Sequence, residues 1–281
     1  MFFFILIFSG FFFLIGKVYD DPWGYLTIGI LISLVSSIGS YYFSDKLILL
    51  TVRAIPADKR RYFNFYTVTE NLAISSGLPM PKLYVIEDPS PNAFATGRDD
   101  KHAIVCATTG LLEILDRSEL EGVIGHELSH IKNYDMLVMS IVSVLVGTIA
   151  LISDWVIRRI WWGRNGREER NNVNPIFYIL FIVSLILTPL VATLIQLSIS
   201  RKREFLADAS SALLTRNPKG LIAALQKLND YNRPLASATN STAHLFIVNP
   251  LKQSKSLMSK FSNLFSTHPP IEERIKILRS I

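Results

Sequence analysis

Four apolar runs without a charged side chain restrict the folds that are open to this sequence. They are Met1–Gly16, Tyr25–Phe43, Met136–Ser153 and Ile176–Ser200. A helix needs about 20 apolar residues to cross the hydrocarbon core of a bilayer, so the last three runs are long enough to span one. The first run is short unless Lys17 snorkels to the interface and Val18 and Tyr19 extend it. Hydrophobic residues make up 49% of the 281 positions and the mean hydropathy is +0.32, which also indicates a membrane protein.

Each of these runs has an alternative interpretation. Met1–Gly16 could be a cleaved signal peptide, but it has no basic n-region and no clear small-x-small site before Lys17, so a retained anchor is favoured. The last two runs could be core helices of a large soluble domain. Their length and lack of charge favour the membrane, although Pro189 predicts a kink. We expect four membrane helices and therefore a multi-pass protein.

The segment His126-Glu127-Leu128-Ser129-His130 lies in an apolar, helix-forming stretch. Ser118 as N-cap and Glu121 three residues later predict a capping box and a helix over Ser118–Asn133. Positions i and i+4 share a helix face, so both imidazoles can bind one metal ion. Glu127 can then reach a water on that metal. This is the donor set of a zinc hydrolase, provided that a third ligand comes from elsewhere; the alternative is a chance motif with both histidines on a polar surface.

A candidate third ligand follows the fourth apolar run, in the segment Arg203-Glu204-Phe205-Leu206-Ala207-Asp208. Glu204 and Asp208 are one helical turn apart and share a face. A carboxylate from Glu204 would complete a His₂Glu site. Asp208 could accept a hydrogen bond from a ligand imidazole and fix its tautomer. The alternative is a charged helix face on which Glu204 pairs with a nearby Arg or Lys.

These motifs carry a family resemblance. The pair HELSH and EFLAD resembles the gluzincin metalloproteases, and the whole sequence resembles the HtpX-like membrane zinc proteases, which are related to the CAAX prenyl proteases. The matching segments are Pro91–Gly97, Gly122–Asp135, Ser200–Asp208, Ala243–Pro250 and Phe265–Ile275. The resemblance covers nearly the whole length in the expected order. It implies that His126, His130 and Glu204 bind one zinc ion per chain and that Glu127 is the general base.

The order of motifs and runs predicts the domain organisation and the topology. His130 precedes the third run and Glu204 follows the fourth, so the two runs must form a hairpin that returns to the same side of the membrane. The expected parts are two N-terminal transmembrane helices (residues 1–43), the first part of the catalytic domain with the HELSH helix (44–135), a transmembrane hairpin with a basic loop (136–200) and the second part of the catalytic domain with the EFLAD helix and a C-terminal helix (201–281).

Charge places the catalytic domain in the cytoplasm, at the inner face of the cell membrane. Two long polar segments, Ser44–Asp135 and Arg201–Ile281, hold most of the Lys and Arg residues. The positive-inside rule assigns such segments to the cytoplasm. The loop Arg158–Asn174 disagrees, because it carries five arginines and must lie outside if both hairpin helices span. The long segments and the hairpin geometry outweigh this short loop.

The polar segments predict a mixed catalytic domain, so the fold class is α+β, mainly helical, with a zincin-like domain in which a small sheet packs on the active-site helix. The predicted strands are Lys82–Ile86, Asn92–Thr96 and His102–Thr108. The predicted helices besides the active-site helix are Arg61–Gly77, Gly110–Leu115 and Ile271–Ser280. Asn232–Lys260 is rich in Ser, Asn and Lys, and we expect it to be mobile.

Two further assignments depend on the resemblance. It places residues Asn92, Ala93, Phe94, Ala95 and Thr96 on an edge strand that pairs with extended substrate through main-chain hydrogen bonds. An ordinary hairpin strand is the alternative, and Asn92, which could donate to a substrate carbonyl, is otherwise a turn residue.

The resemblance also puts His268 near the cleft, where it could stabilise an oxyanion as a catalytic residue. The alternative, slightly favoured, is a histidine that anchors the C-terminal helix.

The cysteine content indicates the redox compartment, and the net charge limits the classes of binding partner. One cysteine, Cys106, excludes an intramolecular disulfide and fits a reducing compartment. A net charge of +6 would suit nucleic acid, but no basic stripe with interleaved aromatic residues is evident. Anionic lipid of the bilayer explains the excess better.

The function expected from these motifs and from the resemblance is that of a membrane-integral zinc endopeptidase. The resemblance implies that its substrates are damaged or misassembled membrane proteins or unfolded polypeptides, which we expect it to cleave at the cytoplasmic face. One alternative is a CAAX prenyl protease, although that family has a larger helical cage than four apolar runs supply. Another is a membrane scaffold with a vestigial metal site, against which Glu127 beside intact ligands argues. The oligomeric state stays undefined.

Overall fold

The computed structural model describes residues 2–18, 20–142, 201–231, 233–239, 242–250 and 269–281. The chain divides into two compact units, each formed from two stretches of sequence. One unit combines Met1–Tyr42 with Ile141–Leu194, and the other combines Phe43–Ser140 with Ile195–Ile281. The family-like motifs all fall in the second unit, which is therefore called the catalytic unit below.

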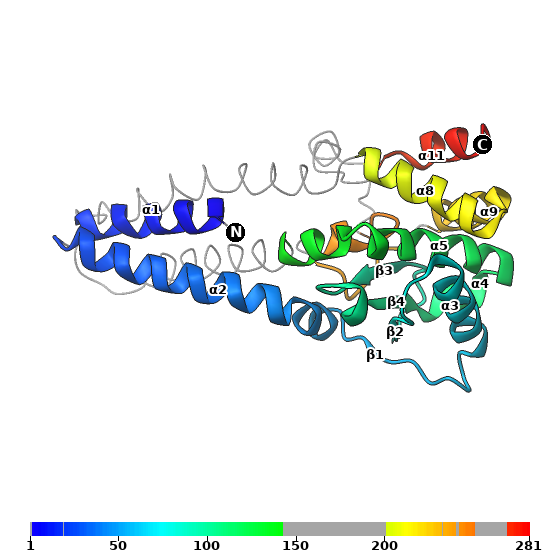
Figure 1. Cartoon of the computed structure of the whole chain (residues 1–281), viewed down its shortest axis with the longest axis horizontal. Coiled ribbons are helices and arrows are strands. Elements are labelled where there is room, and N and C mark those ends of the chain that lie inside the picture. The colour runs from blue at the N-terminus through cyan, green and yellow to red at the C-terminus, as the bar shows by residue number, and fades with distance from the viewer. Residues whose placement is uncertain (1, 19, 143–200, 232, 240–241, 251–268) are drawn as a thin grey trace, which may run out of the picture. The chain divides into compact units, whose positions relative to one another are not determined.

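The described part of the first unit consists mainly of a pair of antiparallel helices, α1 (Phe2–Val18) and α2 (Pro22–Thr51) as far as Tyr42 (Figure 1). The rings of Phe13 and Trp23 pack edge to face with their centroids 5.8 Å apart. Within the described residues, α2 is the one helix long and apolar enough to cross a membrane, by length and composition. The hairpin expected over residues 136–200 lies almost wholly outside the described residues, so the multi-pass topology stays a prediction.

The catalytic unit contains a four-stranded mixed sheet in the order β1-β2-β4-β3. Its strands are β1 (Ile55–Pro56), β2 (Lys82–Ile86), β3 (Ala93–Thr96) and β4 (Ile104–Thr108). β2 and β4 are parallel, whereas β1 and β3 run antiparallel to their neighbours. The prediction for β2 is confirmed in full. β4 is shorter than predicted because the Asp99 side chain accepts a hydrogen bond from the His102 amide and winds the preceding residues into a 3-10 turn, η1 (Asp100–His102).

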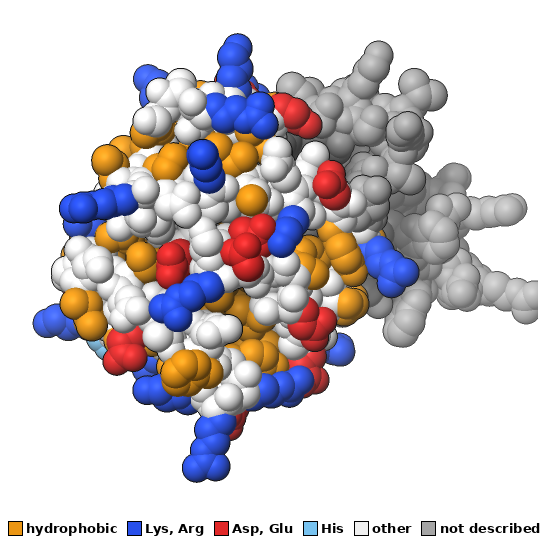
Figure 2. Space-filling view, turned by 90° about the vertical axis from the view of Figure 1, so that its right-hand side faces the viewer, with side chains coloured by type: hydrophobic (Ala, Val, Ile, Leu, Met, Phe, Trp, Pro, Cys, Tyr) orange, Lys and Arg blue, Asp and Glu red, His pale blue; other side chains and the backbone are white. Residues whose placement is uncertain are grey.

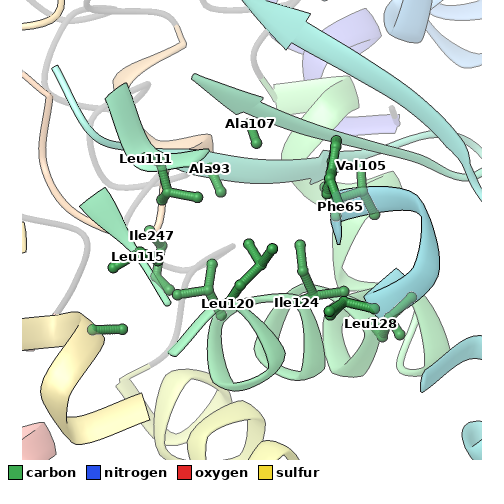
Figure 3. Packing of buried hydrophobic residues seen from close by; sticks show 14 of the residues in the cluster. Phe65, Ala93, Val105, Ala107, Leu111, Leu115, Leu120, Ile124, Leu128 and Ile247 are labelled. Carbon is green, nitrogen blue, oxygen red and sulfur yellow. The ribbon is translucent and has the colours of Figure 1, made fainter. Parts of the chain in front are cut away.

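Helix α5 (Arg117–Lys132) lies under this sheet and joins it in one hydrophobic core (Figure 3). Leu120, Ile124 and Leu128 recur every four residues, so they share the face that meets the buried sheet residues, among them Val105. Burying each such side chain stabilises the fold by about 1.5–3 kcal/mol. The prediction of a small sheet packed on the active-site helix is confirmed, and the core holds that helix in place.

The start of α5 differs from the prediction. Asp116 is the N-cap, and its carboxylate accepts a hydrogen bond from the Glu119 amide while the Glu119 carboxylate accepts from the Asp116 amide. The predicted cap, Ser118, already lies inside the helix, where its hydroxyl accepts from the Asn217 side chain. Glu121 instead pairs with Arg117 on the helix surface. The capping box is real, but it begins two residues earlier than predicted.

The remaining described helices surround α5 and the sheet. They are α3 (Phe63–Ser76), α4 (Thr109–Ile114), a helical segment over 135–142, α8 (Arg201–Thr215), α9 (Pro218–Asp230), the 3-10 turn η2 (Ala243–Leu245) and α11 (Ile271–Leu278). α9 crosses α5 closely because Gly122 has no side chain, and a Cβ there would lie 2.6 Å from the Leu221 nitrogen. Of Asn232–Lys260, the structure describes residues 233–239 and 242–250, and the expected mobility of this stretch stays a prediction.

The face of the catalytic unit drawn in Figure 2 has a surface of mixed charge. Figure 2 shows Lys and Arg side chains interspersed with Asp and Glu, with scattered hydrophobic side chains between them. Such scattered apolar side chains are normal on solvated surfaces. This face therefore gives no sign of a specialised interaction surface.

Candidate metal centre

Helix α5 presents His126 and His130 from the same face, one turn apart. Their Nε2 atoms lie 3.2 Å from each other, and the two rings are nearly perpendicular, with an angle of 86° between their planes. Both side chains are buried, at 1% and 5% exposure. The i and i+4 spacing of the sequence motif thus brings two imidazole nitrogens to one point in the protein interior.

Glu204 reaches the same point from the first turn of α8. Its Oε2 lies 3.6 Å from the Nε2 of His126, and its Oε1 lies 3.5 Å from the Nε2 of His130. A tetrahedral zinc ion with bonds of 2.0–2.2 Å separates its ligand atoms by about 3.3–3.6 Å. The 3.2 Å between the two imidazole nitrogens and the two carboxylate distances agree with that requirement. These three side chains, called the ligand cluster below, therefore fit a metal ion of this type.

Asp208, one turn along α8, lies behind His126. Its Oδ1 is 2.9 Å from the Nδ1 of His126. A carboxylate accepts hydrogen bonds, so Nδ1 carries the proton and the lone pair of Nε2 points into the ligand cluster. Burial lowers the pKa of His126 to about 4, which keeps this ring neutral near pH 7.

Arg274 of α11 fixes Asp208 in turn. Its Nε donates to Oδ2 at 2.8 Å and its Nη2 donates to Oδ1 at 2.6 Å, a bidentate pair. Burial alone would raise the pKa of Asp208, but the Arg274 cation outweighs it and lowers this pKa to about 2. Arg274 also donates from Nη1 to the carbonyl of Ile247 at 3.0 Å. Sequence reasoning did not identify Arg274 as a site residue.

A second aspartate backs His130 in the same way. Asp135 Oδ2 lies 3.1 Å from the Nδ1 of His130, and Asp135 Oδ1 pairs with Arg203. Burial alone would lower the pKa of His130. The hydrogen bond to Asp135 and the nearby carboxylates outweigh burial and raise this pKa to about 9. Each histidine of the ligand cluster thus has an aspartate behind it, and each aspartate has an arginine. Asp135 and Arg203 were also not identified from the sequence.

Glu127 lies beside the ligand cluster and is 2% exposed. Burial raises its pKa to about 7, although a backbone hydrogen bond from Ala95 opposes this shift. A carboxylate with a pKa near the working pH can both accept and return a proton. Its position beneath β3 links the predicted general base to the predicted substrate strand.

The register of β3 shows which of its residues face away from β4. The Asn92 carbonyl accepts from the Thr108 amide of the β4 side, whereas the Ala93 carbonyl accepts from the Ile247 amide on the opposite side. Main-chain groups alternate along a strand, so Ala95 faces the same outer edge as Ala93. The chain itself covers this edge at Ala93 and leaves Ala95 facing Glu127.

The structure gives Asn92 an internal partner. Its side-chain Nδ2 donates to the Val248 carbonyl at 2.8 Å, and its Oδ1 accepts from the Ala93 amide at 3.1 Å. If the Asn92 side chain donated to a substrate carbonyl, that hydrogen bond would have to replace the one to the Val248 carbonyl. The side chains of Phe94 and Thr96 are buried, the first against Phe246 and the second bonded to Ser140. His268 lies outside the described residues.

A His₂Glu donor set with a buried carboxylate beside it, under the outer edge of a sheet, is the arrangement of a metallopeptidase. Sequence comparison gives the same class: the pattern of peptidase family M48 matches residues 63–281. The chain belongs to peptidase family M48 and is a metalloprotease, a hydrolase.

Similar proteins support this assignment over most of the chain. It is 44% identical over 286 residues to a "Protease HtpX homolog" of Caldanaerobacter subterraneus subsp. tengcongensis, covering 99% of this chain and 93% of that one. It is 50% identical over 241 residues to a "Protease HtpX homolog" of Tropheryma whipplei (strain Twist), covering 86% and 80% respectively. The predicted resemblance to HtpX-like proteases is confirmed.

The fold is also similar to that in the crystal structure of S. mikatae Ste24p. The TM-score is 0.54 at 18% sequence identity, and the match covers 97% of this chain and 62% of that one. This likeness concerns the fold alone.

Proposed function

We propose that the chain is a membrane-integral zinc endopeptidase that cleaves polypeptides in an extended conformation. The observation that carries the proposal is the ligand cluster with Glu127 beside it and the outer edge of β3 at Ala95 above it. His126, His130 and Glu204 would hold zinc, because two imidazole nitrogens and one carboxylate at these separations match its tetrahedral coordination. Zinc bound there supplies a Lewis acid that polarises the scissile carbonyl and acidifies water.

The side chains of the protein carry the proton. Glu127 takes a proton from the attacking water and returns it to the leaving amine, which requires a pKa near the working pH. Burial raises the Glu127 pKa to about 7, close to that requirement. The outer edge of β3 would align the substrate backbone by main-chain hydrogen bonds at Ala95, and the substrate would have to take over the Ala95 amide from the Glu127 carboxylate. Such pairing reads little of the substrate sequence.

The membrane assignment rests on the apolar runs and on α2. Substrates released or exposed at a membrane, such as damaged or misassembled membrane proteins, suit an enzyme that is anchored there and reads backbone instead of side chains. We place cleavage at the cytoplasmic face because the polar segments hold most of the Lys and Arg residues.

Glu127→Gln tests this proposal, because it preserves size and removes proton acceptance. Purified in detergent and loaded with zinc, the variant should keep the metal and lose casein cleavage by at least the ~10²–10⁴-fold that acid–base help supplies. Glu121→Gln is the matched control, since it makes the same change on the surface of the same helix and should leave both properties unchanged.

Two outcomes would contradict the proposal. Substantial cleavage by zinc-loaded Glu127→Gln would show that Glu127 is not the general base. Normal zinc binding after Glu204→Ala would show that Glu204 is not the third ligand. A prenylated CAAX peptide in the same assay addresses the alternative function. Preferential cleavage of that peptide over casein would favour a CAAX prenyl protease.

A further inference from the structure

The chain leaves the catalytic unit after Ser140 and returns to it at Ile195. Asp135 precedes the first of these points by a few residues, and Arg203 follows the second. They are 68 residues apart in sequence, yet their side chains form an ion pair. The pair therefore joins the segment in which the chain leaves the catalytic unit to the segment in which it returns.

Asp135 also contacts the ligand cluster. Its Oδ2 lies 3.1 Å from the Nδ1 of His130, and only 4% of its side chain is exposed. Both carboxylate oxygens are thus engaged, one by His130 and the other by Arg203. A buried carboxylate requires such partners, because an uncompensated buried charge is costly.

The short helical segment after Asp135 is attached to two other elements near the ligand cluster. The Met139 carbonyl lies 3.2 Å from the Nε2 of His244, which is buried in η2. The Ser140 hydroxyl lies 2.8 Å from the hydroxyl of Thr96, the last residue of β3. The outgoing chain is therefore held at the ligand, at η2 and at the end of β3.

We propose that Asp135 and Arg203 are positioning residues for the metal ligand His130. Asp135 fixes the tautomer and the direction of the imidazole, and Arg203 holds Asp135 in place. The consequence is that the two ends of the inserted segment, residues 141–194, are coupled to one ligand of the metal. This inference rests on the proposed function, because it assigns the pair a task only if His130 binds a metal.

Zinc affinity of the detergent-purified full-length chain tests the inference, measured by competition with a chromophoric chelator. A Glu127→Gln background prevents self-cleavage. Weakening the hydrogen bond behind a ligand histidine lowers metal affinity by about 10–100-fold. Asp135→Asn should do so, because its neutral amide oxygen is a weaker acceptor than the carboxylate and offers Arg203 no anion. Arg203→Ala should lower affinity in the same direction, and Arg203→Lys should restore part of it.

A double-variant cycle separates positioning from a general effect on charge. Arg203 acts through Asp135, so Arg203→Ala should add little to Asp135→Asn. Lys202→Ala, the same charge change on the adjacent exposed residue of α8, should leave zinc affinity unchanged. The visible absorption bands of the cobalt-loaded protein should shift in Arg203→Ala and not in Lys202→Ala, because the ligand field at His130 changes.

Three results would overturn the inference while the proposed function stands: parental affinity in Arg203→Ala, parental affinity in Asp135→Asn, or additive losses in the double variant. Arg203 is 42% exposed, so its replacement is tolerated and carries the test if Asp135→Asn does not fold. A folded parent without zinc affinity would overturn the proposed function and this inference together.

Discussion

Replacement of Arg274 by leucine tests how the site is held together. The Arg274 side chain is fully buried and donates two hydrogen bonds to Asp208, at 2.8 Å and 2.6 Å, and one to the Ile247 carbonyl at 3.0 Å. Leucine fills part of the volume but leaves Asp208 as a buried anion without its cation. Removing one member of a buried ion pair costs about 3–5 kcal/mol of folding free energy.

This cost can be measured as a change in melting temperature. In a domain of 150–250 residues each kcal/mol lowers the melting temperature by about 2–4 °C, so Arg274→Leu should unfold about 6–20 °C below the parent. Both proteins are stripped of metal with a chelator and heated in detergent at one fixed rate, because unfolding of such proteins is often irreversible. Circular dichroism follows the loss of helix.

Two further variants show whether the buried pair is responsible. Lys276→Leu makes the same charge change on the exposed face of α11 and should alter stability by no more than about 0.5 kcal/mol. Asp208→Asn combined with Arg274→Leu removes both charges and keeps an oxygen acceptor for His126, so the double variant should melt above Arg274→Leu alone. A parental melting temperature for Arg274→Leu, or additive losses in the double variant, would refute the reasoning.

Three other predictions concern the strand, the helix contact and the topology. Ala95→Pro should keep zinc and lose peptide cleavage. Ala95→Gly should lose less cleavage, because it keeps the backbone amide. Thr96→Pro should instead lower the melting temperature, since the register turns the Thr96 amide toward β4. Gly122→Ala should lower the melting temperature despite a gain in helix propensity of about 1 kcal/mol, because the new Cβ would lie 2.6 Å from the α9 backbone. In a background without the native cysteine, Asn165→Cys should react with an impermeant thiol reagent on intact cells and Ser254→Cys only after permeabilisation; protection of both would place the Arg-rich loop in the cytoplasm.

The sequence predicted the parts of the site that depend on local spacing. The i and i+4 rule brought His126 and His130 to one face, and the one-turn spacing of Glu204 and Asp208 did the same on α8. β2 was predicted to the residue because its apolar run is bounded by Pro81 and by polar residues. Helix ends were less certain, since Asp116 and Ser118 are both good N-caps and only the geometry of the Glu119 carboxylate decides between them.

The residues that the sequence did not reveal act through contacts without local periodicity. Asp135 follows His130 by five positions, which do not share a helix face. It reaches the imidazole because α5 ends at Lys132 and Tyr134 takes a left-handed conformation, with φ of 58°, which interrupts the helical spacing before Asp135. Arg274 is remote in sequence from every residue that it contacts in the site. No spacing rule links it to Asp208, and only the packing of α11 against α8 and α9 shows the pair.

The order in which the chain supplies these groups matters during its synthesis. Helix α5 is made first, Glu204 and Asp208 follow, and Arg274 comes 148 residues after His126. At 5–20 residues per second, about 7–30 s pass between the first and the last of these residues. The nascent chain carries the HELSH helix without its carboxylate ligand until Glu204 is made, and without the arginine that holds Asp208 until the end of the interval. A growing chain therefore lacks the complete ligand cluster until Glu204 has been made, and it lacks the support of Asp208 until Arg274 has been made.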